Sequence, residues 1–224
     1  MFEFLTLQNL PEIQSAVLRP NTNTRPAVLR VIDGEVKAVV KDFSRLGFLY
    51  RNTVGRFLVW RESKAYRHLR GVDGTPRLFR LIDGLALVIE EIRGRSLENA
   101  YRDITLPASF FNDLEDLVNR VHKRGLAHCD LKKEANVLLG EDGRPYIIDW
   151  GAAIHEREFR WYPLKLVFKR FVTDDHMALV KLKILHIPES VTRKEWERYN
   201  TRSRGECLVR SIRDRLRHLL QKVV

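Results

Sequence analysis

The first third of the chain alternates hydrophobic and polar positions with the period of a β-strand. The runs are short and rich in β-branched residues, and turn residues separate them. An Asp33-Gly34 pair joins two of the runs, which is the strongest short hairpin signal. The expected strands are residues 13–19, 27–32, 35–43, 76–83 and 85–92. This pattern predicts an antiparallel sheet.

Two later segments follow the period of a helix. The first runs through residues 62–69 and stops at Gly71. The second begins near Leu106, repeats apolar residues every three or four positions, and ends at Gly125. The first helix lies between the expected strands, so it belongs to the β-rich part of the chain.

The remainder reads as a loop, a hairpin and further helices. Residues 128–136 (HCDLKKEAN) form the loop, and residues 137–149 (VLLGEDGRPYIID) form the hairpin. In the last expected helix Leu208, Ile212, Leu216 and Leu219 line one face. The whole pattern predicts an α+β fold with two lobes. Residues 1–93 form an antiparallel β-sheet lobe with one helix, and residues 94–224 form a reduced, mainly helical lobe.

Composition narrows the class of protein. The chain has 224 residues, 44% of them hydrophobic, which is enough for a core without a disulfide framework or a structural metal. Two cysteines are too few for a secreted scaffold and indicate a reducing compartment. No apolar run approaches the roughly 20 residues of a membrane-spanning helix. We expect a cytoplasmic protein, soluble or peripheral at the inner face of the membrane.

The net charge of +11 is concentrated near the C-terminus. Residues 155–224 contain 17 Lys and Arg against 9 Asp and Glu, a net of +8, and residues 1–154 carry the other +3. Such a surplus favours an anionic partner. We expect no nucleic acid, because no zinc spacing, RNP-like motif or basic region accompanies the charge.

Three short sequence motifs follow one another along the chain. They are AVVK ending at Lys41, the loop HCDLKKEAN with Asp130 and Asn136, and IDWG with Asp149. Together they resemble the strand lysine, catalytic loop and metal-binding motif of the protein-kinase-like superfamily. The resemblance covers roughly residues 13–185 and includes Glu62 on the helix between the strands. It implies the same bilobal fold.

The resemblance implies ATP and Mg²⁺ as cofactors and gives each residue a role. Lys41 would contact the α- and β-phosphates, and Glu62 would hold its ammonium group by an ion pair. Asp149 and Asn136 would hold magnesium. Asp130 would accept the proton of an alcohol hydroxyl.

Weaker placements follow from the same resemblance. Lys132 would touch the γ-phosphate during transfer. Backbone groups from Glu91 to Arg93 would bind the adenine edge, as the hinge between the lobes. Val39 and the region 137–139, including Leu139, would sandwich the adenine ring.

The sequence departs from the family pattern in three places. Asn136 follows Asp130 by six positions, one more than usual, which leaves Glu134 as a rival metal ligand. Cys129 replaces the arginine of the catalytic loop. Residues 19–26 (RPNTNTRP) stand where a glycine-rich loop is usual, which opens the alternative of a pseudokinase that binds nucleotide as an interaction module.

The acceptor is left open between two classes. The chain resembles small prokaryotic kinases of the RIO type and the lipopolysaccharide-core (Kdo or heptose) kinases, so a protein Ser/Thr and a lipid-linked glycan are rivals. Asp174 or Asp175 would support the catalytic loop, or would cap a helix over residues 177–186. The aromatic and basic stretch at 159–171 either contacts an anionic membrane or packs internally with a solvated basic face.

Overall fold

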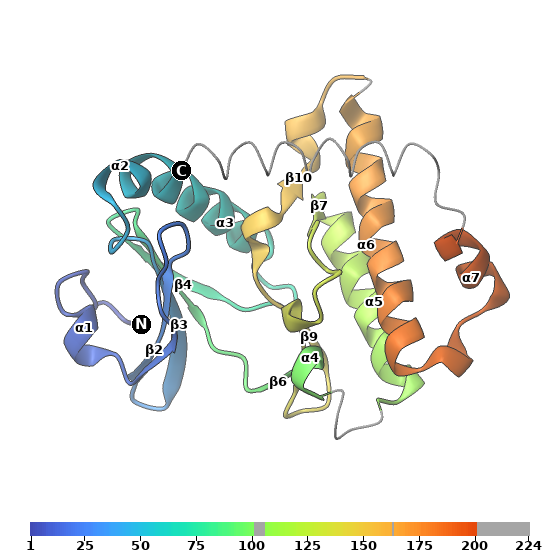
Figure 1. The fold of residues 1–224 in the computed structure, drawn as a ribbon, viewed down its shortest axis with the longest axis horizontal. Helices are drawn as coiled ribbons and strands as arrows, with labels where there is room; N and C mark the ends of the chain where they lie inside the picture. Colours follow the sequence, from blue (N-terminus) through green and yellow to red (C-terminus); the bar gives the residue numbers. More distant parts are fainter. Residues whose placement is uncertain (101–105, 163, 201–224) are drawn as a thin grey trace.

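A computed structural model describes residues 1–100, 106–162 and 164–200. It contains a five-stranded antiparallel sheet in the N-terminal part and a mainly helical C-terminal part (Figure 1). This is the expected α+β architecture. The boundary at residues 93 and 94 stays a prediction. The expected helix around Leu208 to Leu219 and the second cysteine, Cys207, lie outside the described residues.

The strands of the large sheet lie where the sequence predicts them; four are shorter than predicted, and β2 is one residue longer. Their spatial order is β1, β2, β3, β5, β4, and every neighbouring pair is antiparallel. Gly34 takes a positive φ of 60° at the predicted hairpin between β2 and β3. The strands are β1 (Ala16–Arg19), β2 (Ala27–Asp33), β3 (Val36–Asp42), β4 (Leu78–Ile82) and β5 (Ala86–Glu90).

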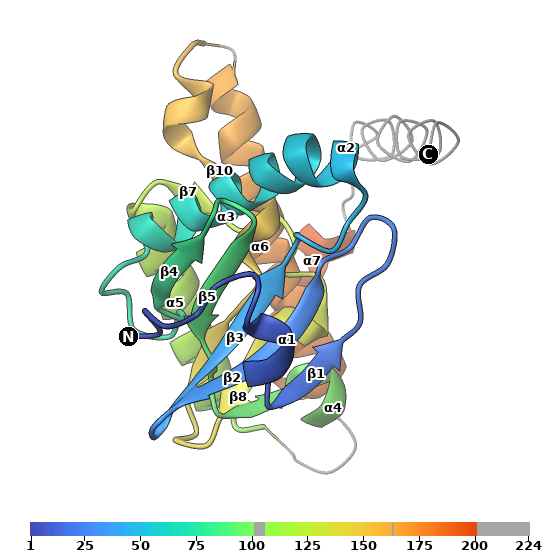
Figure 2. The same ribbon diagram turned by 90° about the vertical axis from the view of Figure 1, so that its left-hand side faces the viewer.

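The N-terminal residues cover the outer face of this sheet, which the sequence did not reveal. The short helix α1 (Leu10–Ile13) and the residues before it lie against β2 and β3 (Figure 2). Phe2, Leu5 and Leu10 are fully buried there, packed in one cluster with the outward-facing side chains of the strands. The sheet is therefore buried on both faces.

The helix between β3 and β4 is longer than predicted. It begins at α2 (Phe48–Tyr50), passes through a π-helical turn at Arg51–Gly55 and continues as α3 (Arg56–His68). The sequence placed its start near Glu62, because the preceding residues are basic and aromatic and show no clear apolar face. The buried side of α3 faces the inner side of the sheet and carries Glu62 into the core.

Helices α5 and α6 form the frame of the C-terminal lobe. The remaining elements pack around them, including a three-stranded sheet of β6, β8 and β9. The elements are β6 (Gly94–Ser96), α4 (Leu97–Ala100), α5 (Ala108–Lys123), β7 (Leu126–Ala127), β8 (Val137–Gly140), β9 (Pro145–Ile147), β10 (Ile154–His155), α6 (Leu164–His186) and α7 (Arg193–Asn200). None of the helices in the described ranges is long and apolar enough to cross a membrane.

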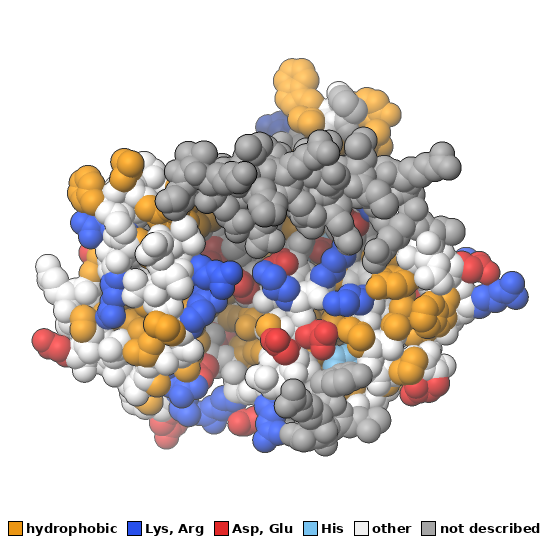
Figure 3. All heavy atoms as spheres, viewed as in Figure 1, with side chains coloured by type: hydrophobic (Ala, Val, Ile, Leu, Met, Phe, Trp, Pro, Cys, Tyr) orange, Lys and Arg blue, Asp and Glu red, His pale blue; other side chains and the backbone are white. Residues whose placement is uncertain are grey.

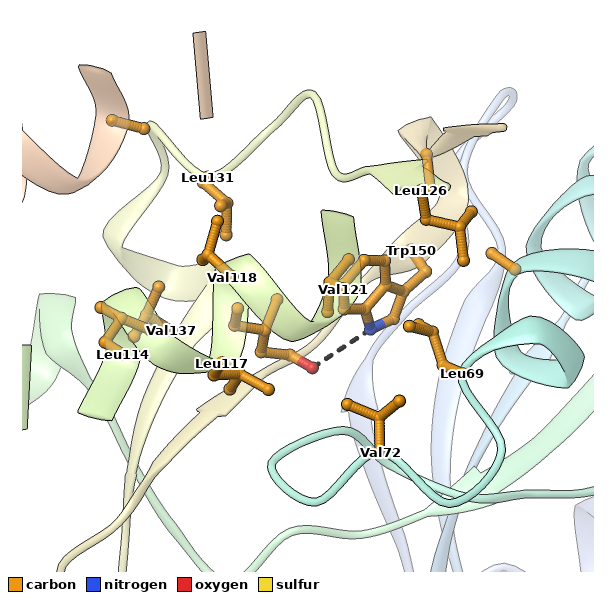
Figure 4. Close-up of a cluster of buried hydrophobic side chains, with 14 of the residues drawn as sticks. Leu69, Val72, Leu114, Leu117, Val118, Val121, Leu126, Leu131, Val137 and Trp150 are labelled. Carbon is orange, nitrogen blue, oxygen red and sulfur yellow. Dashed lines mark hydrogen bonds between the residues drawn. The ribbon is translucent and has the colours of Figure 1, made fainter. Parts of the chain in front are cut away.

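Among the described residues Trp150 is the largest fully buried side chain, and it joins the two lobes (Figure 4). Its indole contacts the apolar face of α5 and the loop that follows α3, and its Nε1 donates to the carbonyl of Ile147 at 3.2 Å. Because the buried indole N–H has a hydrogen-bond partner, burying the tryptophan leaves no unsatisfied donor in the core. The residue after Asp149 is thereby fixed in the core.

The helix-cap prediction for residues 174 and 175 is wrong. Helix α6 is continuous over 23 residues, and both aspartates lie in its interior. An N-cap residue must precede the first helical turn, so neither can take that role. Asp175 is buried instead, with a different function in the fold.

Candidate active site

Lys41, Glu62 and Asp149 meet at the inner side of the sheet. The Lys41 Nζ lies 2.6 Å from Glu62 Oε1 and 2.7 Å from Asp149 Oδ1. Lys41 comes from β3, Glu62 from α3 and Asp149 from the segment after β9. Three positions that span 108 residues of sequence thus form one charge cluster. The Lys41 and Glu62 side chains are only 12% and 4% exposed, whereas that of Asp149 is 45% exposed.

Burial and charge act in opposite directions on these three groups. Burial alone would lower the pKa of Lys41, but the two carboxylates outweigh it and raise that pKa. Burial raises the pKa of Glu62 although Lys41 opposes the change. Burial would also raise the pKa of Asp149, but the attraction of Lys41 prevails and lowers it. Asp149 is therefore held as a carboxylate that faces solvent.

A strained turn orients Asp149. Its backbone has φ 63° and ψ 66°, the left-handed region that costs energy for a residue with a side chain. Trp150, fixed in the core, follows it directly. At Gly151 an added Cβ would lie 3.5 Å from Glu62 Oε2, so the backbone passes close to the ion pair. The buried anchor holds the strained residue in place beside the cluster.

The loop after β7 brings Asp130 and Asn136 together. The Asn136 Nδ2 donates to the carbonyl of Asp130 at 3.0 Å and lies 3.5 Å from its Oδ2. The extra residue of this loop is taken up by a 3₁₀ turn at Glu134–Asn136, whose last N–H bonds to the Lys133 carbonyl. Asn136 is thus returned to Asp130 despite the longer spacing.

Lys133 contacts the expected base, and Lys132 does not. The Lys133 Nζ lies 2.5 Å from Asp130 Oδ2, and its charge also helps to lower the pKa of Asp149. Lys132 is exposed, and its carbonyl accepts a bond from the Lys181 Nζ. Lys132 stays the position that the resemblance implies for contact with the γ-phosphate. Lys133, which the resemblance did not name, is the lysine that the structure places against Asp130.

Asp175 holds the backbone of this loop from below. Its carboxylate accepts the backbone N–H of His128 at 2.7 Å and of Cys129 at 2.9 Å, and it lies 3.1 Å from His122 Nε2. Cys129 has a φ of 67°, so the loop turns sharply where Asp175 holds it. Of the two aspartates named from the sequence, the structure selects Asp175. Asp174 is half-buried and pairs with Arg170 at 3.2 Å.

His128 contributes a neutral ring under the loop. Its Nε2 lies 3.0 Å from the carbonyl of Ile148, and its Nδ1 is 3.2 Å from the backbone N of Asp130. A carbonyl can only accept and an amide N–H can only donate, so Nε2 carries the hydrogen. Burial lowers the pKa of His128, which agrees with a neutral ring. The histidine joins the segment before Asp149 to Asp130.

The rival metal ligand, Glu134, points elsewhere. Its Oε2 lies 3.5 Å from the Nε2 of His186 at the end of α6. Asn136, in contrast, is buried beside Asp130 with its amide nitrogen already used. The geometry favours Asn136, because its side-chain oxygen is the atom left to face a ligand.

The expected hinge is partly occupied by internal hydrogen bonds. The backbone N–H of Glu91 donates to the carbonyl of Lys37 at 3.2 Å, and the carbonyl of Arg93 accepts from Glu141 at 3.0 Å. The Glu91 side chain forms a bidentate pair with Arg30. Between them, Ile92 makes no backbone hydrogen bond to any described residue. Ile92 is therefore the hinge position with free backbone groups.

The two residues expected to contact the adenine ring belong to different sheets, Val39 to β3 and Leu139 to β8. Val39 alternates with the buried Ala38 and Val40, so it shares the inner face with Lys41. Val39 and Leu139 are both partly buried and pack against the same hydrophobic cluster. Their contact with an adenine ring stays a prediction.

The loop between β1 and β2 has no glycine but is held in place. Residues 20–25 are exposed, and the N–H of Thr22 bonds to the carbonyl of Arg25 at 3.1 Å. The Tyr50 hydroxyl donates to the carbonyl of Thr24 at 3.0 Å, which ties the loop to the start of the long helix. This loop is therefore fixed without the flexibility that glycines give.

The donor set fits magnesium when phosphates complete it. Asp149 offers a carboxylate oxygen, Oδ2, that makes no hydrogen bond to a described residue, and Asn136 offers an amide oxygen. Magnesium in nucleotide sites usually has one or two carboxylates with phosphates and water. Among the described residues no group of three His, Cys, Asp or Glu could hold a metal by itself.

A cavity lies away from these residues. It has a volume of about 1330 Å³ and is lined by the end of α3, strand β4, helix α5 and the hairpin of β8 and β9. Neither Lys41, Asp130 nor Asp149 lines it. The candidate site is therefore assigned from its charged and amide groups and not from a cavity.

Comparison with known proteins identifies the fold. No family model matches the sequence, and no curated protein does. Many solved structures match. One is the crystal structure of the Rio2 kinase-ADP/Mg²⁺-phosphoaspartate complex from Chaetomium thermophilum, with a TM-score of 0.60 and 18% sequence identity. The match covers 86% of this chain, which spans 62% of the length of that one. The chain has a bilobal, protein-kinase-like fold.

Proposed function

We propose that this protein is an ATP- and magnesium-dependent phosphotransferase that transfers the γ-phosphoryl group to an alcohol hydroxyl. The observation that carries the proposal is the Lys41 ammonium held between Glu62 and Asp149. Ile148, next to Asp149, is hydrogen-bonded to Asn136 and, through His128, joined to Asp130. Phosphoryl transfer needs positioning and neutralised phosphate charge more than covalent chemistry from the protein. A protein-kinase-like fold with this cluster supplies both.

The chain's own residues divide the work. Lys41, freed from Asp149 on nucleotide binding, contacts the α- and β-phosphates, and Glu62 keeps its ammonium in place. Asp149 and Asn136 hold magnesium, which neutralises phosphate charge when bound. Val39 and Leu139 contact the adenine ring, and the backbone of Ile92 meets its edge.

Asp130 takes the proton of the acceptor hydroxyl. The hydroxyl oxygen then bonds to the γ-phosphorus as the bond to the β-phosphate oxygen breaks, and ADP leaves. Lys133 lies against Asp130 and near Asp149, so its ammonium group is placed to stabilise charge on the transferring group. Asp175 keeps the loop backbone fixed while this occurs.

For the acceptor, we propose a Ser or Thr hydroxyl of a protein. Support comes from the fold match to a protein named as a Rio2 kinase. The alternative is a lipopolysaccharide-core sugar, for which the protein would have to work at an anionic membrane surface. The matched Rio2 kinase complex also contains a phosphoaspartate, so label on a carboxylate of the present chain is a third destination to test.

A pseudokinase is the non-catalytic alternative. The observation in its favour is the loop at residues 20–26, which lacks the glycines that allow close approach to phosphates. Nucleotide binding without turnover would support this alternative. It predicts ATP-dependent protection from thermal unfolding in the absence of any labelled product.

The test is transfer of labelled phosphate from γ-labelled ATP into fractionated cell material. Label in protein, acid-stable and resistant to hydroxylamine, supports the Ser/Thr acceptor, and label in glycolipid supports the sugar. Hydroxylamine-sensitive label on the chain indicates a carboxylate. Asp149→Ala should abolish magnesium-dependent transfer and keep the fold, while Asp116→Ala, an exposed change on α5, should transfer normally. Equal transfer by the parent and the Asp149 variant would disprove the assignment.

A second variant tests the base. Asp130→Asn keeps the shape of the side chain but cannot accept the proton, so single-turnover transfer should fall by about two to four orders of magnitude with ATP binding retained. Parent-like transfer by this variant would require another base.

A further inference from the structure

The N-terminal end of α6 projects from the body of the protein (Figure 1). We call Arg160–Tyr162 together with Leu164–Arg170 the projecting tip. Trp161 and Tyr162 are 80% and 78% exposed, the largest exposed fractions of the big hydrophobic residues described. Of the helical residues in the tip only Phe168 is buried. Exposed aromatic and aliphatic side chains gathered on one projection indicate an interaction surface.

The tip and its base carry a surplus of positive charge. Between residues 157 and 170 there are five Lys and Arg and one acidic residue, Glu158. Arg160, Lys165 and Lys169 are exposed, with no ion pair to a described residue. Apolar and basic side chains therefore alternate on the same projection.

A second exposed apolar group lies at the same end of the molecule. Phe48 and Leu49 of α2 are 73% and 75% exposed, and Phe57 and Trp60 of α3 are 52% and 54% exposed. Helix α2 and the tip both lie in the upper part of the two perpendicular views (Figures 1 and 2). Figure 3 shows one group of hydrophobic side chains at the upper left and another at the top. The two groups therefore lie at the same end of the protein.

Two contacts hold these groups in a fixed relation. The Lys64 Nζ of α3 lies 3.4 Å from Glu158 Oε1 at the base of the tip. The Arg61 Nε of α3 donates to the carbonyl of Ala153 at 3.1 Å. The segment before the tip is therefore joined to α3, which fixes the exposed side chains of the tip relative to those of α2 and α3.

We propose that this side of the protein docks on an anionic lipid bilayer, with Trp161 and Tyr162 inserted at the level of the headgroups. Tryptophan and tyrosine favour the membrane interface because one end of each is apolar and the other polar. Lysine is depleted from protein–protein interfaces, whereas interfacial helices combine lysine and arginine with aromatic residues. The exposed lysines of the tip therefore favour lipid over a protein partner.

Docking needs no catalysis, so its test is separate from that of the proposed function. The full chain is floated with vesicles of phosphatidylcholine containing about one third phosphatidylserine, and with vesicles of phosphatidylcholine alone. We expect binding to the anionic vesicles at about 0.05 M salt, and strong weakening at about 0.5 M salt. Absence of binding at low salt overturns the proposal, whatever the transfer assay gives.

Variants identify the surface. Trp161→Ala with Tyr162→Ala should lower the partition coefficient at least about tenfold. Lys165→Gln with Lys169→Gln should lower it by about fivefold for each charge removed. As a control, Trp196→Ala on α7 should bind like the parent. Parent-like binding by the two tip variants overturns the proposal.

Two further measurements test whether the tip or another part of the chain contacts the lipid. Quenching of tryptophan emission by brominated lipid should be strong in the parent and reduced in Trp161→Phe. Basic residues of the C-terminal segment are the rival source of binding. If Arg213→Gln with Arg217→Gln removes all binding while the Trp161 and Tyr162 changes remove none, that segment and not the tip is the docking surface.

Discussion

Replacing Lys41 by methionine should destabilise the folded protein, and the size of the loss follows from burial. The substitution keeps the length of the side chain but removes the ammonium group that contacts Glu62 and Asp149. Glu62, 4% exposed, is then left as an uncompensated buried carboxylate. Breaking a buried ion pair by removing one partner costs about 3–5 kcal/mol. Asp149 is 45% exposed, so water can replace most of what it loses.

The loss should depend on pH with a defined sign. Burial already raises the pKa of Glu62, and removing Lys41, which lowers it, raises it further. A carboxyl group whose pKa is raised in the folded state does not lower the free energy of unfolding at pH values below its pKa in the unfolded state, about 4.3. Above that value stability falls by about 1.4 kcal/mol per pH unit until the folded pKa is reached. The difference between parent and variant should therefore grow from pH 5 to pH 7.

Urea unfolding followed by tryptophan fluorescence at several pH values measures this difference. As a matched control, Arg193→Met removes one partner of an exposed pair with Glu197 and should cost less than about 0.5 kcal/mol. Adding Glu62→Leu to Lys41→Met should recover more than half of the loss, because the buried charge is gone. The reasoning is refuted if Lys41→Met costs no more than the control at pH 7, or if the loss is the same at pH 5.

Three further changes test other parts of the site. In Asp175→Asn the side-chain NH₂ cannot accept one of the two backbone N–H groups that the carboxylate accepts, so this variant should lose about 2–4 kcal/mol of stability in urea unfolding. Asp174→Asn should be close to neutral. Trp150→Ala should lose about 3–5 kcal/mol by opening a cavity between the lobes, and Trp150→Phe clearly less; equal losses would contradict the packing argument. Lys133→Ala should lower the rate of phosphate transfer, and Lys132→Ala should leave it unchanged; the reverse order would restore the sequence-based choice.

The fold could be predicted from the sequence because its strands and main helices carry strong local patterns. Alternation in β2 and β3, and the apolar face of α5, specify their own burial. The N-terminal covering of the sheet could not be predicted this way. Phe2, Leu5 and Leu10 are separate apolar residues in an irregular segment, and only the assembled sheet gives them a place to pack.

Part of the candidate site could also be predicted from the sequence, and part could not. Short motifs named Lys41, Glu62 and Asp149, and the structure brings their charges together. Their catalytic roles stay predictions. Which of Lys132 and Lys133 contacts Asp130 depends on how the loop folds, which no local sequence pattern reports. Whether Asp174 or Asp175 supports the loop depends on which side of α6 faces it. The contact joins His128 and Asp175, which are 47 positions apart in the sequence.

The carboxylate of Asp175 also sets the order in which the site can form. It bonds to backbone groups 46 and 47 positions earlier, so the turn at Cys129 has no acceptor until that part of α6 exists. During synthesis on the ribosome, the loop with Asp130 is made well before the residue that shapes it. The loop around Asp130 should therefore stay unordered in the nascent chain until α6 has been made and packs against it.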